Sequence, residues 1–160
     1  MSKQLTITKL NNEYKKQFGG QKKITLKTGD YLYVQTVFKK TSIQKLILDY
    51  QTILEEARTN LSDANVLKDL SFAYYMLLLR HFTNLDNIPI ELAPMVAVCE
   101  KLIDLDILED ILASFPAEEL VKINEQLRLV EENSRSIGEQ WGEMMAAAAG
   151  NKTNRGNQNE

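Results

Sequence analysis

Residues 66–82 read VLKDLSFAYYMLLLRHF and form the most apolar stretch of the chain. Between Phe72 and Leu79 the apolar side chains would cover every side of an α-helix, as in a helix that several neighbours bury. We therefore expect residues 63–83 to form a helix at the centre of the hydrophobic core. The other elements should pack around it.

Helical periodicity also marks the segments on either side of this stretch. Thr41 or Ser42 is a suitable N-cap for the preceding helix. Its apolar face would consist of Ile43, Leu46, Ile47, Tyr50, Ile53, Leu54 and Ala57. Residues 90–114 predict one broken helix or two short ones, with Pro94 in a first turn.

The first forty residues contain a predicted β-hairpin. Residues 22–27 alternate between polar and apolar side chains, and residues 31–38 are rich in aromatic and β-branched side chains. Thr28-Gly29-Asp30 between them is a turn signal, because glycine adopts positive φ without strain. Two strands alone are marginally stable in water, so the hairpin should pack on the helices.

The segment before the hairpin is also expected to be extended. Leu5-Thr6-Ile7 alternates, and breaks are expected at Asn11-Asn12 and at Gly19-Gly20. The N-terminal segment therefore predicts either the hairpin alone or a meander of three or four strands.

These patterns together predict an α+β fold that is predominantly α. A small N-terminal β-hairpin or meander is followed by a helical bundle and a long C-terminal amphipathic helix. With 160 residues the chain is long enough for one ordinary domain. We expect that domain over residues 1–149, with a β-rich basic segment (1–40), a helical core (41–114) and the C-terminal helix (115–149), and a disordered polar tail over residues 150–160.

The net charge of −3 conceals a strong division along the chain. Residues 1–40 hold nine lysines and two acids, a balance of +7, whereas residues 41–160 hold ten basic and twenty acidic residues, a balance of −10. The basic segment is suited either to an anionic partner or to the acidic helices of its own chain or of a neighbouring subunit. Both readings remain open at this point.

Residues for catalysis are scarce. His81 is the single histidine and Cys99 the single cysteine, and both stand in apolar surroundings that favour structural roles. The acids from Asp104 to Asp110 lack the glycine and terminal glutamate of an EF-hand calcium loop and suit the outer face of a short amphipathic helix. We therefore expect no enzyme, no metal and no cofactor.

The composition also indicates where the protein works. One cysteine excludes an intramolecular disulfide and is typical of a reducing, cytoplasmic compartment. The N-terminus MSKQLTITKL has no apolar core of a secretory signal, and no run reaches the about 18 apolar residues of a membrane span. We expect a cytoplasmic protein without membrane contact.

The alternative of nucleic-acid binding depends on the second predicted strand. Tyr31, Tyr33 and Phe38 stand near Lys27, Lys39 and Lys40, a composition suited to single-stranded nucleic acid. A strand, however, places Tyr31, Tyr33 and Val37 on one face and Leu32, Val34 and Phe38 on the other. One of these faces must belong to the core, so nucleic acid is the less favoured partner.

The strongest signal for association lies near the C-terminus. From residue 120 to residue 144 apolar side chains recur at alternating intervals of three and four, which places them on one narrow stripe of a helix. We call this stripe the seam: Leu120, Ile123, Leu127, Val130, Ser134, Ile137, Trp141 and Met144. We expect the seam, except for Ser134, and Met145 to bind a protein partner or a second copy of the chain, with Trp141 as a hot spot.

The whole-chain pattern resembles the small tail assembly chaperones of long-tailed bacteriophages. A β-rich start (22–38), a helical body (42–114), a terminal amphipathic helix and an Asn-rich tail carry the resemblance. It implies a helical protein of the host cytoplasm that keeps the tape-measure protein soluble before the tail tube polymerises around it. Many such phages also make a longer product by ribosomal frameshifting, and Ala149-Gly150-Asn151 can be encoded by a slippery heptamer.

Overall fold

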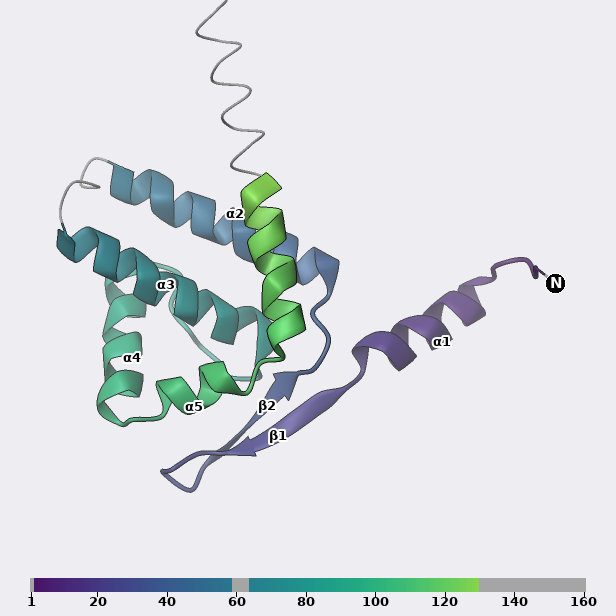
Figure 1. The fold of residues 1–160 in the computed structure, drawn as a ribbon, viewed down its shortest axis with the longest axis horizontal. Helices are drawn as coiled ribbons and strands as arrows, with labels where there is room; N and C mark the ends of the chain where they lie inside the picture. Colours follow the sequence, from purple (N-terminus) through teal and green to yellow (C-terminus); the bar gives the residue numbers. More distant parts are fainter. Residues whose placement is uncertain (1, 59–63, 130–160) are drawn as a thin grey trace, which may run out of the picture. The chain divides into compact units, whose positions relative to one another are not determined.

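The computed structural model describes residues 2–58 and 64–129. Its elements follow the chain in this order (Figure 1): helix α1 (Ile7–Phe18), strands β1 (Gln21–Thr25) and β2 (Tyr31–Gln35), and helices α2 (Lys40–Ala57), α3 (Ala64–Phe82), α4 (Leu92–Asp104) and α5 (Leu108–Ala113). Residues 117–129 are helical as well. The predicted fold class is confirmed: the chain is α+β and mostly α, with a two-stranded hairpin near its N-terminus.

The predicted β-hairpin is present. β1 pairs with β2 in an antiparallel register that sets Gln21 opposite Gln35 and Thr25 opposite Tyr31. Gly29 lies in the turn with a φ of 90°, a conformation that other residues rarely adopt. Within the described residues the sheet has these two strands, so a larger meander is not formed there.

Helix α1 occupies Ile7–Phe18, where an extended segment was expected before the hairpin, and that part of the prediction is wrong; Leu5 and Thr6 precede the helix. The side-chain oxygen of Thr6 accepts a hydrogen bond from the backbone N–H of Lys9 at 3.2 Å and caps the start of α1. Asn11-Asn12 lies inside the helix, and Gly19 is its C-cap. Alternation over three residues fits a helix as well as a strand, and the cap decides in favour of the helix.

Helices α2 and α3 form the centre of the body as predicted. The buried side chains of α2 are Ile43, Leu46, Ile47, Ile53 and Ala57. α3 packs against α2 and α4 (Figure 1), and its Met76, Leu77 and Leu79 are fully buried. The central apolar run of the sequence is therefore a central part of the core.

The expected cap of α2 is wrong. The helix begins at Lys40 with Lys39 as N-cap and with no capping bond from a side chain. The backbone N–H of Ile43 already donates to the carbonyl of Lys39 at 3.0 Å. Thr41 therefore lies in the first turn of the helix and does not precede it.

Residues 92–113 contain two short helices, one of the two forms expected for this segment. Pro94 lies in the first turn of α4. Asp106 lies between α4 and α5 and has a φ of 59°, a left-handed conformation that interrupts the helix. The break leaves Leu105 exposed, whereas Ile107 is buried.

Three phenylalanines that are distant in sequence meet in the core. Phe38 stacks on Phe82 with ring centroids 3.8 Å apart, and Phe115 meets Phe38 edge-on at 5.7 Å. Leu32 and Val34 of β2 are buried with Phe38. The face of the second strand that carries Leu32, Val34 and Phe38 is therefore the one that packs in the core.

The chain divides into two compact units, Met1–Ile123 and Asn124–Glu160. The first contains α1–α5 and both strands, and the described residues of the second, 124–129, are helical. The later part of the expected C-terminal helix and the expected tail over residues 150–160 lie outside the described residues. The single domain expected over residues 1–149 stays a prediction.

Candidate interaction surface

The residues best suited to catalysis take part in packing. The Nε2 of His81, at the end of α3, lies 2.8 Å from the Oδ2 of Asp49 on α2, so this contact joins two neighbouring helices. Cys99 on α4 is fully buried. Burial raises the pKa of its thiol to about 11, and a thiol that keeps its proton at neutral pH is a poor nucleophile.

The acidic stretch lies at the junction of α4 and α5. The Nζ of Lys27 is 2.7 Å from the Oδ2 of Asp106, and this hydrogen-bonded ion pair raises the pKa of the lysine. Asp104, Glu109 and Asp110 are exposed. Within residues 2–58 and 64–129, no three His, Cys, Asp or Glu side chains are grouped so that they could hold a metal ion.

The aromatic and basic residues of the hairpin region are divided between core and surface. Phe38 belongs to the core, whereas Tyr31 is exposed, with the Nζ of Lys23 4.4 Å from its ring centroid. Lys39 is directed elsewhere, with its Nζ 4.9 Å from the ring centroid of Tyr14 in α1. The rings available for base stacking are therefore fewer than the sequence indicated.

The described part of the seam is helical. Leu120 and Leu127 are half-buried, and Ile123 is fully buried. A side chain packed inside its own chain is not accessible to a partner, so the expected role of Ile123 is corrected to a core residue. The remaining predicted contacts lie outside the described residues: Val130, Ile137, Trp141, Met144 and Met145.

The start of the seam helix is anchored by a residue that sequence reasoning missed. Glu119 is buried, and its Oε2 accepts a hydrogen bond from the backbone N–H of Phe38 at 3.2 Å. The same oxygen lies 2.7 Å from the Nζ of Lys122. The sequence offers only the favourable place of an acid in a first helical turn, which does not indicate this distant partner.

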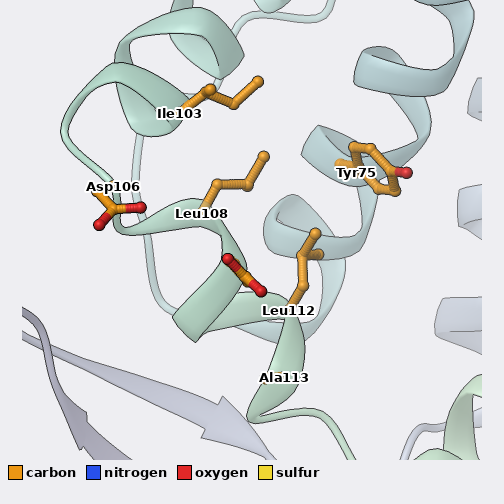
Figure 2. Close-up of a pocket in the computed structure, with 7 residues that line it drawn as sticks. Tyr75, Ile103, Asp106, Leu108, Leu112 and Ala113 are labelled. Carbon is orange, nitrogen blue, oxygen red and sulfur yellow. The ribbon is translucent and has the colours of Figure 1, made fainter.

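A groove opens between α3, α4 and α5 (Figure 2). Its main part has a volume of about 470 Å³ and is lined by Tyr75, Ile103, Asp106, Leu108, Glu109, Leu112 and Ala113. Figure 2 shows Ile103, Leu108 and Leu112 directed toward the space that Tyr75 faces from α3. A second hollow of about 270 Å³ shares Ile103 and adds Lys68, Phe72, Glu100 and Asp104.

These two hollows are together called the α3–α5 groove. Its aromatic and aliphatic side chains come from three helices, whereas four carboxylates stand along it. The larger hollow has a mainly apolar lining, whereas charged side chains predominate in the smaller one. An apolar centre beside charged residues is typical of a surface that binds another protein. The sequence did not predict this groove because its residues are assembled by packing.

Helix α1 carries a second apolar surface. Ile7, Leu10 and Tyr14 are 72%, 47% and 48% exposed, and no residue of the helix is buried. Together with Phe18 they recur at intervals of three, four and four, which places them on one side of the helix. We call these four residues the α1 stripe. The spacing was visible in the sequence, but the expectation of a strand concealed it.

Comparison with protein families identifies the group to which this mostly helical α+β chain is related. The model of the YomO family matches residues 7–158. The chain therefore belongs to the YomO family. This is a family of the phage and Bacillus type, and membership in it points to a phage-associated protein. No curated protein and no solved structure matches the chain.

Across the described ranges, no helix combines the length and the apolar character that crossing a bilayer requires.

Proposed function

We propose that the chain is a non-enzymatic interaction protein that acts as a tail assembly chaperone. In this proposal it binds the tape-measure protein in the host cytoplasm and keeps it soluble until the tail tube forms. A long, apolar, helical chain aggregates when its surface is bare. A protein that covers that surface lowers the population of the aggregation-prone form by mass action. Membership of a phage-type family supports this setting.

The observation that carries the proposal is the helical start of the seam. Residues 117–129 form a helix, so the alternating intervals of three and four do place Leu120, Ile123 and Leu127 on one side. Ile123 and Glu119 fix the first turns to the body of the chain. We propose that the later seam residues, with Met145, contact the tape-measure protein: Val130, Ile137, Trp141, Met144 and Met145.

The test is co-expression with the tape-measure protein encoded by the same phage. The readouts are the soluble fraction of the tape-measure protein and its recovery on the tagged chain. We expect the wild-type chain to raise both. The variant Ile137→Asp with Trp141→Ala should abolish both, because it removes two large apolar side chains from the seam.

A matched control distinguishes the seam from the rest of this segment. Ser136→Asp with Gln140→Ala makes the same kinds of change at neighbouring positions outside the seam. It should behave like the wild type. Equal loss in both double variants, or no effect of the wild-type chain on the tape-measure protein, would overturn the proposal.

A nucleic-acid-binding accessory protein remains the alternative. It would use the lysines of residues 1–40 and would be retained on single-stranded DNA or RNA at low salt. Retention would fall steeply toward physiological salt, and the seam variant would leave it unchanged. That result, without an effect on the tape-measure protein, would favour the alternative.

A further inference from the structure

The α1 stripe and the larger hollow of the α3–α5 groove are both lined by apolar side chains. Side chains at intervals of three, four and four are the anchors of a helix that lies in an apolar groove. Helix α1 has 12 residues and is therefore about 18 Å long. The groove extends along α3 from Lys68 through Phe72 to Tyr75, about two helical turns, so several anchors of the stripe can be accommodated along it.

The charges of the two surfaces are also complementary. Residues 2–18 carry four lysines and one glutamate, a balance of +3. The groove is lined by four acids (Glu100, Asp104, Asp106 and Glu109) and by Lys68, a balance of −3. Viewed down the axis of α1, Lys15 is rotated about 80° from Ile7, which places this lysine beside the α1 stripe. Opposite charges of this size favour the encounter of the two surfaces.

Helix and groove lie at opposite ends of β1 within one chain. α1 ends at Phe18, three residues before β1 begins, whereas Lys27, two residues after β1 ends, contacts Asp106 at the groove rim. The carbonyl of Gly20 accepts hydrogen bonds from the backbone N–H and the hydroxyl of Thr36, at 3.3 and 3.1 Å. These bonds hold the start of β1 beside Thr36, so α1 leaves the hairpin at the end opposite the Lys27–Asp106 contact.

We propose that α1 docks into the α3–α5 groove of a second copy of this chain. Because each copy has both surfaces, two copies exchange their helices, and the contact forms twice around a two-fold axis. The exchange covers the apolar side chains of both surfaces. It does not require the tape-measure protein, so its test is independent of the function proposed above.

The test is the mass of the purified full-length chain in solution, measured by sedimentation equilibrium over a range of concentrations. We expect a dimer, with twice the 18.3 kDa of one chain. Ile7→Asp with Leu10→Asp should weaken association by about a hundredfold, since losing each large apolar contact costs about tenfold or more. No residue of α1 is buried, so this variant leaves the core unchanged.

Two variants test the groove separately. Ile103 is 41% exposed on α4, and Ile103→Asp should also produce a monomer; its control is Leu48→Asp on α2, where the leucine is 62% exposed. Glu109→Lys at the rim should weaken association about tenfold and reduce its dependence on salt. Glu56→Lys, an exposed glutamate on α2, is its control. Both controls should remain dimeric.

Several results would overturn the proposal. One is a wild-type chain that is monomeric at all concentrations. The others are a dimer that persists in the α1 variant and a dimer that persists in the Ile103→Asp variant. Another partner for the basic α1 is an anionic membrane surface. A chain that is monomeric and sediments with phosphatidylserine vesicles through Ile7 and Leu10 would therefore overturn the proposal as well.

Discussion

The carboxylate of Glu119 accepts a hydrogen bond from the backbone N–H of Phe38, across 81 residues of sequence. Phe38 follows β2 and lies in the aromatic cluster of the core, whereas Glu119 lies in the first turn of the seam helix. Lys122, one turn later, pairs with the same carboxylate. The buried acid therefore joins the hairpin side of the core to the helix on which the proposed function depends.

Replacing Glu119 tests this connection. Glu119→Ala should lower the free energy of unfolding by about 1–3 kcal/mol, because it leaves a buried backbone N–H without an acceptor. Glu119→Gln keeps an acceptor oxygen and should cost about half as much. Urea unfolding measures both, and Glu118→Ala, at an exposed neighbouring position, should change little. An equal cost at both glutamates would show that the long-range bond contributes nothing.

The hairpin turn offers a test of backbone conformation alone. Gly29 has a φ of 90°, and a side chain at this position would meet no atom within 4 Å. Gly29→Ala should therefore destabilise the fold by about 1 kcal/mol through backbone strain, with no steric clash. Gly29→Asn should cost less, since asparagine tolerates positive φ. Thermal unfolding would contradict this account if alanine and glycine gave the same midpoint.

The N-cap of α1 should control that helix without affecting the core. Thr6→Ala removes the hydrogen bond to the N–H of Lys9, worth about 1 kcal/mol. Because α1 buries no residue, amide hydrogen exchange within the helix should become about fivefold faster, while global unfolding stays unchanged. The measurement is made at a concentration where the chain is monomeric. Thr6→Ser keeps the oxygen and should retain slow exchange; fast exchange in this control would exclude capping as the cause.

Alkaline pH should destabilise the protein. The pKa of Cys99 is raised to about 11 by burial, so above about pH 9 the unfolded chain loses a proton that the folded chain keeps. The free energy of unfolding should therefore fall between about pH 9 and pH 11. The raised pKa of half-buried Tyr74 acts in the same direction at higher pH. Urea unfolding at pH 8 and pH 10.5 measures the loss, and Cys99→Ala should reduce it.

Cys99 also reports on opening of the fold. In the folded chain the thiol is buried and keeps its proton at pH 8. A thiol reagent should therefore react only when the fold opens, and the reaction should accelerate in urea. Rapid reaction of the native protein would show that α4 does not protect this side chain.

The regular elements with strong local patterns could be predicted from the sequence. The periodic apolar face of α2, the continuous apolar run of α3 and the turn at Gly29 each depend on neighbours within a few residues. α1 was missed although its signals are local as well. Its cap at Thr6 and its spacing were outweighed by a short alternation and by paired asparagines.

The sites depend more on distant contacts. Ile123 has the spacing of a partner-binding residue, but the body of the chain buries it. The α3–α5 groove joins residues as far apart as Lys68 and Leu112, and no periodicity within one segment marks such a group. The structural roles expected for His81 and Cys99 followed from their apolar surroundings, whereas the contact of His81 with Asp49 required the packing of α2 on α3.

The sequence by itself determined the class of fold, the place of the hairpin, the central helix and the opposite charges of the two parts of the chain. Each of these follows from local propensity, periodicity or composition. Only the tertiary structure decided which face of β2 is buried, which seam residue belongs to the core, and which apolar side chains of α1 remain exposed. Burial depends on which segments meet in space, and this depends on the packing of the whole chain.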